Sequence, residues 1–396
     1  MKKKVVAIAL AIMMCISFTI FTGCSDKEAA GASDSGTAAT STEQQAGNGE
    51  KPMEGKKLGI LLSVSGSGAT KYANININQV IEDMGGTTQW EDFDFTPEGL
   101  ISGVEKLITA GCDGIIVVPS GDSALPKVTQ MCEEAGVYWG IFLRSINDEE
   151  IRKMVTESEY YVGNTYEDEI MHGYEFGKRV GESGAKKVAI ISTAKGDTTG
   201  DNREIGFNKA CDEYGIEIVA EARAIAQADE ATKAVESFIA SYPDLDAVCV
   251  VASQVPTLEA ACQGIRDTDS IGKVMLHYGD FATGMPEAIE EGIASSFAGG
   301  HIPYDATVCA AMVYNILQGT PISDEKMSIR IAEMPVSTTE DAEAYYKYVE
   351  GDIPLFKAEE VDTMLNKAKN PDLTEEEFIA LGENFGMEDL VKRNGE

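Results

Sequence analysis

The sequence predicts an α/β protein with two similar lobes, each built on a parallel sheet, and a helical C-terminal extension. From residue 57 onward, short apolar segments alternate with helical stretches, which is the pattern of strands joined through helices. Residues 113–119 form an apolar run without alternation, as is typical of a strand buried on both faces. The phrases GCDGIIVVPS and DLDAVCVVAS each precede a helix, so the same arrangement occurs twice.

The first lobe is predicted from glycine and proline residues that end or begin helices, as well as from its apolar segments. Gly85-Gly86 ends one helix, and Pro97 lies in the first turn of the next. The expected strands are residues 57–64, 87–93, 113–119 and 137–142, and the expected helices are residues 69–84, 97–110 and a third that ends at Ala135.

The second lobe repeats this alternation, and a helical tail follows it. The expected strands are residues 187–192, 216–220, 245–252 and 273–278, and the expected helices are residues 202–214, 228–241 and 258–265. Beyond Val336, helices are expected at residues 339–349, 359–369 and 373–381, the last with a capping box of Thr374 and Glu377. We expect this tail to pack on the second lobe, and contact with a partner protein is the alternative.

The N-terminal segment predicts export from the cytoplasm. Three lysines precede an uncharged apolar run over residues 5–21, and Phe21-Thr22-Gly23-Cys24 closes it. The segment resembles bacterial lipoprotein signals, which implies that residues 1–23 are a signal peptide and that Cys24 is lipidated. An uncleaved membrane helix and an ordinary secreted form are the alternatives. All three place the rest of the chain outside the cytoplasm.

Residues 24–55 are predicted to be the lipidated cysteine followed by a flexible tether. They are rich in Ser, Thr, Gly, Ala, Gln and Glu and have no aliphatic periodicity. A coil of this length spans roughly 30 Å root-mean-square. The folded part is therefore expected to stay anchored to the outer face of the cytoplasmic membrane.

The charge of the chain excludes several kinds of partner. The formal net charge is −34, and without residues 1–23 it becomes −37, from 29 basic and 66 acidic residues. A surface this acidic repels nucleic acid and anionic lipid headgroups. Acidic runs such as Glu375-Glu376-Glu377 are expected on solvated helix faces.

Motifs for metal, cofactor or hydrolase chemistry are missing from the sequence, so no cofactor, no metal and no enzymatic activity are expected. There is no GxGxxG, no Gly-Lys-Ser/Thr and no GxSxG, and the three histidines lack metal-ligand spacing. Besides Cys15 and Cys24, the cysteines have no CxxC spacing; we expect small buried hydrophobic side chains, with disulfides as the alternative. They are Cys112, Cys132, Cys211, Cys249, Cys262 and Cys309.

The candidate ligand site lies at the carboxyl ends of the predicted strands, where open parallel sheets bind ligands. Arg144, Arg203 and Asp280 each follow such a strand end. Arginine offers a fixed fork of donors, and aspartate offers two acceptor oxygens for neighbouring hydroxyls. Arg144 and Asp280 belong to different lobes, so we expect them to bracket a ligand. Helix capping or surface ion pairing is the alternative for each residue.

Other residues near these strand ends are expected to line the same cleft. The turn 65–68 between a strand and a helix contributes Ser67, and the loop 252–256 contributes Ser253 and Gln254. Tyr72, Trp90, Tyr138 and Trp139 are nearby aromatic residues. We select Tyr72 and Trp139 as flat apolar platforms for a ring-shaped ligand, with core packing as the alternative for Trp139.

Residues 56–337 resemble the type I periplasmic binding proteins, the ribose- and galactose-binding group. The supporting phrases are GVEKLITAGCDGIIVVPSGDSALPKVTQMCEEAGVYWG, NREIGFNKACDEYGIEIVA, SYPDLDAVCVVAS and YGDFATGMPEAIEEGIASSFAG. The resemblance implies two Rossmann-like lobes joined by a three-segment hinge, near residues 162–165, 297–301 and 330–335. It also implies residues 56–163 plus 300–330 in the N-terminal lobe, and residues 164–299 plus 331–396 in the C-terminal lobe with its extension.

The resemblance further implies a monomeric solute-binding protein that closes over its ligand and delivers it to an ABC permease. The sugar contacts of the family carry over to Arg144, Arg203 and Asp280 of Gly279-Asp280-Phe281. Other sugar-contact positions differ, because Leu143, Val118 and Ala252-Ser253-Gln254 stand where the family has Asp, Asn and an Asn–Asp pair. We therefore expect a sugar or sugar-like ligand. A nucleoside, furanone signal or aromatic metabolite, delivery to a sensory receptor, and an enzyme are the alternatives.

Overall fold

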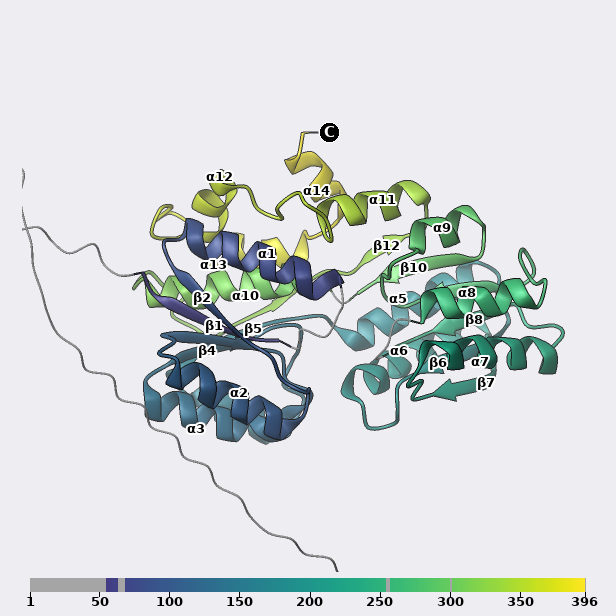
Figure 1. Ribbon diagram of the computed structural model, residues 1–396, viewed down its shortest axis with the longest axis horizontal. Helices are drawn as coiled ribbons and strands as arrows, with labels where there is room; N and C mark the ends of the chain where they lie inside the picture. Colours follow the sequence, from purple (N-terminus) through teal and green to yellow (C-terminus); the bar gives the residue numbers. More distant parts are fainter. Residues whose placement is uncertain (1–54, 63–67, 254–256, 300, 396) are drawn as a thin grey trace, which may run out of the picture. The chain divides into compact units, whose positions relative to one another are not determined.

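The computed structural model describes residues 55–62, 68–253, 257–299 and 301–395, which form two six-stranded sheets with flanking helices (Figure 1). This architecture confirms the predicted α/β class with two lobes. Cys24, Ser67 and Gln254 lie outside the described residues. Among the described residues, no helix combines the length and the apolar character needed to cross a membrane.

The first sheet has the strand order β11-β5-β4-β3-β1-β2, and all its pairings are parallel. Its strands are β1 (Lys57–Leu61), β2 (Thr87–Glu91), β3 (Gly114–Val117), β4 (Tyr138–Ile141), β5 (Tyr161–Tyr166) and β11 (Met327–Arg330). All residues of β3 are buried, as the continuous apolar run predicts. On one face α1 (Gly68–Asp83) contacts α10 (Ile302–Leu317), and α2 (Pro97–Thr109), α3 (Leu125–Ala135) and α4 (Glu149–Glu157) follow one another on the other.

The second sheet repeats this order as β12-β10-β9-β8-β6-β7, and only β12 runs antiparallel to its neighbour. Its strands are β6 (Lys187–Ser192), β7 (Glu217–Arg223), β8 (Ala247–Val250), β9 (Met275–Tyr278), β10 (Ala294–Ala298) and β12 (Met334–Val336). Helices α5 (Glu169–Glu182) and α6 (Thr198–Tyr214) pack together, as do α7 (Ala228–Ser241) and α8 (Leu258–Asp267), which is followed by the short α9 (Met285–Glu290). In each lobe the order reverses beside the first strand, at β1/β3 and β6/β8, which is the switch point where open sheets bind ligands.

Sequence signals explain several of the helix ends. Thr96 caps α2 by accepting a hydrogen bond from the Gly99 amide, and Pro97 follows it at the first helical position. Gly136 ends α3 with a φ of 69°, a left-handed conformation that glycine adopts without a steric cost. The capping box of Thr374 and Glu377 is confirmed at the start of α13 (Glu375–Glu383).

Three crossings join the two lobes. The chain passes from β5 to α5 at residues 167–168, from β10 to α10 at residues 299–301, and from β11 to β12 at residues 331–333. The first crossing lies after the expected residues 162–165, because β5 continues in the first sheet to Tyr166. The hinge thus has the three segments that the sequence resemblance implies.

The C-terminal extension contacts both lobes rather than the second alone. Helix α11 (Thr339–Tyr348) packs against α9 and β12 of the second lobe. The short α12 (Ala358–Glu360) runs into the π-helical turn η2 (Val361–Leu365), which contacts α1 and α10 of the first lobe. Helix α13 packs on β11, and α14 (Met387–Arg393) contacts α11. Our expectation of a tail on the second lobe therefore describes only part of it.

The six cysteines of the described residues are all buried and free. Cys249 lies in β8 within the apolar layer beneath α5 and α6, together with Phe176 and Phe207. This placement confirms the prediction that these cysteines act as small hydrophobic side chains.

Candidate functional site

Arg144 is presented by a constrained piece of backbone just after β4. The residue before it, Leu143, is buried and has a φ of 62°, an uncommon conformation for a residue other than glycine. The Arg144 amide donates to the Thr165 carbonyl at 3.2 Å, and the Asn164 side-chain amide donates to the Arg144 carbonyl at 2.9 Å. These contacts tie Arg144 to β5, so its position depends on the first sheet.

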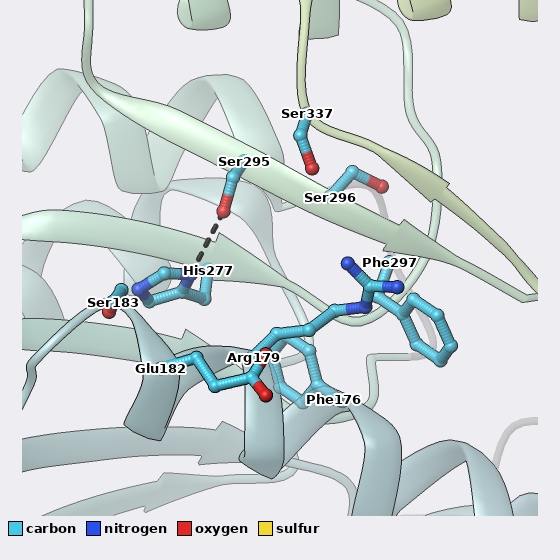
Figure 2. A pocket seen from close by; sticks show the side chains of 9 residues that line it. All are labelled: Phe176, Arg179, Glu182, Ser183, His277, Ser295, Ser296, Phe297 and Ser337. Carbon is cyan, nitrogen blue, oxygen red and sulfur yellow. Dashed lines mark hydrogen bonds between the residues drawn. The ribbon is translucent and has the colours of Figure 1, made fainter.

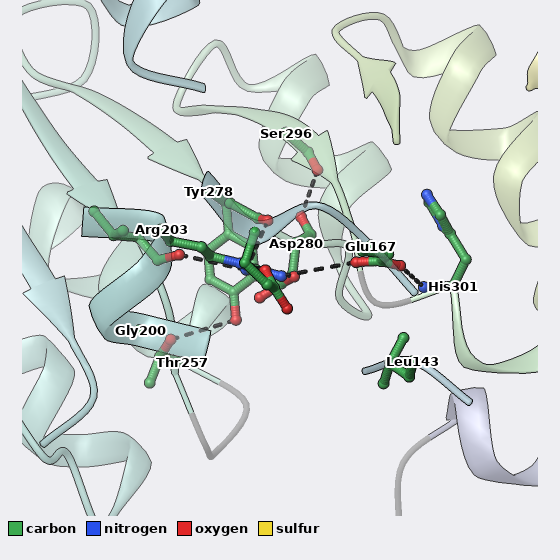
Figure 3. A network of polar contacts seen from close by, with 12 residues as sticks. Leu143, Glu167, Gly200, Arg203, Thr257, Tyr278, Asp280, Ser296 and His301 are labelled. Atoms are coloured by element: carbon green, nitrogen blue, oxygen red, sulfur yellow. Dashed lines mark hydrogen bonds and ion pairs between the residues drawn. The ribbon is translucent and has the colours of Figure 1, made fainter. Parts of the chain in front are cut away.

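Arg203 lies in α6 and is only 3% exposed, and its guanidinium is occupied by groups of the protein (Figure 3). Its Nε donates to Glu169 Oε2 at 2.5 Å, and its Nη1 donates to Asp280 Oδ1 at 2.8 Å. Nη1 also lies 3.2 Å from the Gly279 carbonyl oxygen, which it reaches as a donor. The predicted pair of Arg203 and Asp280 is therefore in direct contact.

Glu169 connects this pair to Arg144. It is the first residue of α5, directly after the first crossing, and its Oε1 lies 3.7 Å from Arg144 Nη1. Since its Oε2 accepts from Arg203, a continuous chain of charges runs from Arg144 through Glu169 and Arg203 to Asp280. The chain links a strand end of the first sheet to strand ends of the second. Sequence reasoning missed Glu169, although its place at the start of a helix just after a predicted crossing is a usable signal.

The protonation of this charge chain is set by burial and by the arginines. Burial raises the pKa of Glu169 above its usual range, and Arg203 and Arg144 oppose that rise. Burial likewise raises the pKa of Asp280, with Arg203 opposing it. Burial would lower the pKa of Arg203, but Asp280 and Glu169 raise it, so the guanidinium stays charged.

Asp280 is held by its backbone as well as by Arg203, while its side chain remains 30% exposed. The Ser296 hydroxyl on β10 donates to the Asp280 carbonyl at 2.5 Å (Figure 3). The Tyr278 hydroxyl, two residues earlier, lies 3.4 Å from the Thr257 hydroxyl. Asp280 is thus a fixed, partly accessible acceptor, which is the property a ligand contact needs.

Glu167 adds a second buried carboxylate from the first crossing. Its Oε1 accepts a hydrogen bond from the His301 amide of the second crossing at 2.8 Å, and its Oε2 lies 4.0 Å from Arg203 Nη2. Through Glu167, the charge chain is therefore connected to two of the three hinge segments.

Trp139 is not a ligand platform, and this prediction is corrected. The side chain is fully buried in β4, and its ring centroid lies 4.9 Å from that of Tyr161 on the neighbouring strand. The core-packing alternative holds because β4 is covered on both faces.

Two other predicted site residues are partly accessible. Tyr72 is half-buried on α1 with Lys71 Nζ 4.6 Å from its ring centroid, and Ser253 is half-buried after β8.

The histidines are structural residues of the second lobe and the hinge. His172, His277 and His301 are all buried, and burial lowers the pKa of His277 to about 4 and that of His301 to about 3. His277 Nδ1 lies 2.9 Å from the Ser295 hydroxyl. Within the described ranges, no three His, Cys, Asp or Glu side chains form a cluster able to hold a metal ion.

Comparison with known proteins identifies the family. The sequence model described as the periplasmic binding protein domain matches residues 58–321. An ABC transporter periplasmic solute-binding protein from Actinobacillus succinogenes, with bound D-allose, is similar at 19% identity and a TM-score of 0.62, over 73% of this chain and 100% of that one. Sequence comparison with curated proteins finds no match.

Two further solved structures share the fold. A solute-binding protein from Bacillus halodurans with bound myo-inositol has 17% identity and a TM-score of 0.60, over 74% of this chain and 98% of that one. One from Burkholderia graminis with D-arabinose has 16% identity and a TM-score of 0.60, over 72% and 96%. With its two predominantly parallel sheets, three crossings and matched domain, the chain belongs to the periplasmic binding protein domain family and has the type I fold.

Proposed function

We propose that this protein binds a sugar or sugar-like small molecule between its two lobes and delivers it to an ABC permease. The lipidated Cys24 holds it at the outer face of the cytoplasmic membrane. The observation that carries the proposal is the charge chain from Arg144 to Asp280, which joins strand ends of both sheets. The family and the sugars named for its structural neighbours, D-allose, myo-inositol and D-arabinose, support the ligand class.

The mechanism is a two-state closure about the hinge. A ligand that accepts hydrogen bonds from Arg144 and donates hydroxyls to Asp280 contacts both lobes at once, so it favours the closed arrangement over the open one. Glu169 lies beside Arg144 at 3.7 Å and competes with the ligand for that guanidinium. Arg203 has its Nε and Nη1 donors occupied by Glu169 and Asp280, and its Nη2 lies 4.0 Å from Glu167, so its role is to position these carboxylates rather than to contact the ligand.

A ligand screen tests the proposal directly. The purified protein is tested by thermal shift against monosaccharides, cyclitols, nucleosides and aromatic metabolites. A true ligand at about 100 times its dissociation constant stabilises the fold by about 2.7 kcal/mol. Mass spectrometry of small molecules retained during purification gives candidates without a panel. Stabilisation by nucleosides or aromatics but by no sugar or cyclitol would contradict the sugar class while leaving the binding role intact.

Alanine substitution of Arg144 or Asp280 is expected to weaken binding of the identified ligand by at least roughly tenfold, because each removes a charged hydrogen bond. Isothermal titration measures the dissociation constants. Arg266→Ala and Asp244→Ala are matched controls, since both residues pair with other side chains at the surface of the second lobe. Unchanged affinity in both Arg144→Ala and Asp280→Ala would contradict the assignment of these residues to the ligand site.

A non-sugar ligand is the second candidate, and it has its own support. Leu143 and Val118 are buried apolar side chains at positions where sugar-binding relatives are expected to carry polar ones, and Arg203 is internally paired. A nucleoside, furanone signal or aromatic metabolite needs fewer hydroxyl partners than a sugar. Such a ligand could equally serve a sensory receptor. Permease and ATPase genes beside this one would favour uptake, and turnover of the bound ligand would point to an enzyme instead.

The lipid anchor is tested separately from binding. In cells, Cys24→Ser is expected to release the protein from the membrane fraction or leave its signal segment uncleaved, because the thiol is the acylated atom. Mass spectrometry of the wild-type N-terminal peptide should show the acyl chains. Cys15→Ser, upstream in the apolar run, is the control and should change neither location nor mass beyond the substitution itself. An unmodified Cys24 in a membrane-bound wild type would contradict the anchor.

A further inference from the structure

A pocket of about 240 Å³ lies beside α5 in the second lobe (Figure 2), and no residue of the charge chain lines it. The C-terminal half of α5 forms one wall with Arg179, and the strands opposite contribute His277 on β9 and Ser295, Ser296 and Phe297 on β10. Ser337, directly after β12, completes the wall near the edge of the sheet. Most side chains around this pocket are hydrogen-bond donors.

Arg179 differs from the other arginines of the described residues. Arg144, Arg203, Arg223, Arg266, Arg330 and Arg393 form ion pairs, and Arg152 donates to a carbonyl. Within the part of the chain that the structure describes, Arg179 has no hydrogen-bond or ion-pair partner, and its Nε is buried without an acceptor. The Phe297 ring packs against this side chain, and its centroid lies 5.0 Å from the guanidinium carbon.

This state of Arg179 is unexpected in so acidic a chain. The formal net charge is −34, so carboxylates are abundant, yet none pairs with this half-buried guanidinium. An arginine cannot become neutral by losing a proton under the conditions in which proteins fold, because the guanidinium is a very weak acid. Burying a charge without a partner is costly, and a ligand that brings an acceptor oxygen removes that cost.

Neighbouring groups supply further unsatisfied hydrogen-bonding capacity. His277 is 6% exposed, its Nδ1 is bonded to the Ser295 hydroxyl, and its Nε2 has no partner among the described residues. Burial lowers the pKa of His277 to about 4, so the ring is neutral at neutral pH. The Ser337 hydroxyl, on the exposed side of the pocket, likewise has no partner within the described chain. Among the described residues that line the pocket, only Arg179 therefore carries a positive charge.

We propose that this pocket is a second ligand site, which binds the oxyanion of a small molecule, a carboxylate or phosphate group, through Arg179 and the Ser337 hydroxyl. The fork of a guanidinium suits two oxygens of one carboxylate or phosphate. The volume lies below the ~300–1,000 Å³ usual for drug-sized ligands, which limits the ligand to a small anion or a small acid. This second site is inferred from the residues of the pocket and does not rest on the ligand proposed to bind between the lobes.

Glu182 lies at the same pocket and gives the proposal a sharper test. It is exposed and makes no ion pair with Arg179 within 4.0 Å. Its carboxylate repels an incoming anion, so it weakens binding rather than supplying the missing partner. Removing it is therefore expected to raise the affinity, whereas removing Arg179 is expected to abolish it. A variant that fails to fold would lose affinity, so a gain in affinity in the Glu182 variant cannot result from misfolding.

The experiment titrates the purified full chain with inorganic phosphate, sulfate and acetate, using sodium chloride to keep the ionic strength constant. Isothermal titration and thermal shift are expected to show saturable binding of at least one of these anions. Arg179→Gln should weaken it by roughly tenfold or more, Glu182→Gln should tighten it several-fold, and Ser337→Ala should weaken it modestly. Arg152→Gln, the same charge change in the first lobe, should leave the affinity unchanged. Preference for acetate over phosphate would identify a carboxylate site, and the reverse a phosphate site.

Two results would overturn the proposal. One is the absence of saturable binding of phosphate, sulfate and acetate beyond the effect of chloride. The other is an affinity that Arg179→Gln and Glu182→Gln leave unchanged, which would place the anion elsewhere. If Arg179→Gln does not fold, Arg179→Lys, Glu182→Gln and Ser337→Ala still decide the matter, because each retains a cation at the pocket.

Discussion

Arg203 and Arg179 lie on neighbouring helices of the second lobe, above the same sheet, and differ in what surrounds their charge. Arg203 is almost fully buried and meets Glu169, Asp280 and a backbone carbonyl. Arg179 is half-buried and meets an aromatic ring and hydroxyl-bearing strands. The first arginine organises groups of the protein, and the second is left with donors for a group that the protein does not supply.

A buried carboxyl group can become neutral by taking up a proton, whereas Arg179 cannot lose its charge, and Asp305 beside the hinge illustrates the difference. Asp305, at the start of α10, is fully buried, and neither of its side-chain oxygens has a partner among the described residues. Burial and the nearby Glu167 raise the pKa of Asp305 well above its usual range, which favours the neutral, protonated form of this carboxyl group. A guanidinium cannot respond in this way. Its lack of a partner is therefore the more informative observation.

The largest effect is expected when the paired arginine is removed. Arg203→Leu leaves Glu169 and Asp280 without their main partner, and breaking a buried ion pair in this way costs about 3–5 kcal/mol. Arg179→Leu removes only a cation–π contact worth about 0.5–1 kcal/mol and is the matched control. Urea unfolding of both variants measures the two losses. Equal losses would show that Arg179 has a structural partner and would erase the contrast between the two sites.

A smaller effect on the free energy of unfolding, which depends on pH, is expected at Glu333 in the third crossing. Burial and then Glu167 raise the pKa of Glu333 to about 7, while the Arg330 side chain, 3.0 Å away, opposes the rise. Because the folded state binds the proton more tightly than the unfolded state, this stabilisation is complete below about pH 4.5 and is lost as the pH rises through 7. A shift of this size corresponds to at most about 3–4 kcal/mol.

Glu333→Gln tests this pH dependence by removing the titration while keeping the shape of the side chain. The free energy of unfolding of the wild type is expected to fall between pH 4.5 and pH 7 more steeply than that of Glu333→Gln. Glu340→Gln on the exposed start of α11 is the control and should follow the wild type. If the free energy of unfolding changes with pH in the same way in the wild type and in Glu333→Gln, ionisation of Glu333 does not destabilise the third crossing and the prediction is wrong.

The sequence predicts the repeated lobes and three members of the charge chain for the same physical reason. Continuous apolar strands reveal parallel sheets, and the carboxyl ends of such strands meet at one edge. Arg144, Arg203 and Asp280 could therefore be chosen by position alone, and the structure brings Arg203 and Asp280 into contact and links Arg144 to them.

Other features depend on three-dimensional packing that a single sequence does not carry. Glu169 was missed because acids are so frequent in this chain that no single one stands out. Trp139 was misassigned because strand periodicity does not show whether both faces of β4 are covered. The partnerless state of Arg179 is a property of its surroundings, since the residue itself looks like an ordinary member of an amphipathic helix. The contacts of the tail with both lobes likewise follow from tertiary packing.

The smallest effect is expected at Ser296, the residue through which the two arginine sites are connected. It lines the Arg179 pocket, and its hydroxyl donates to the carbonyl of Asp280, the residue paired with Arg203. Ser296→Ala removes one buried hydrogen bond and is expected to cost about 1 kcal/mol of stability. The same loss frees the Asp280 backbone, so the affinity for the ligand between the lobes should fall a few-fold, less than in Asp280→Ala. Ser295→Ala is the control, because that hydroxyl faces His277 instead. A loss of affinity in Ser296→Ala but not in Ser295→Ala would show that the Asp280 contact, rather than the pocket wall in general, couples the two sites.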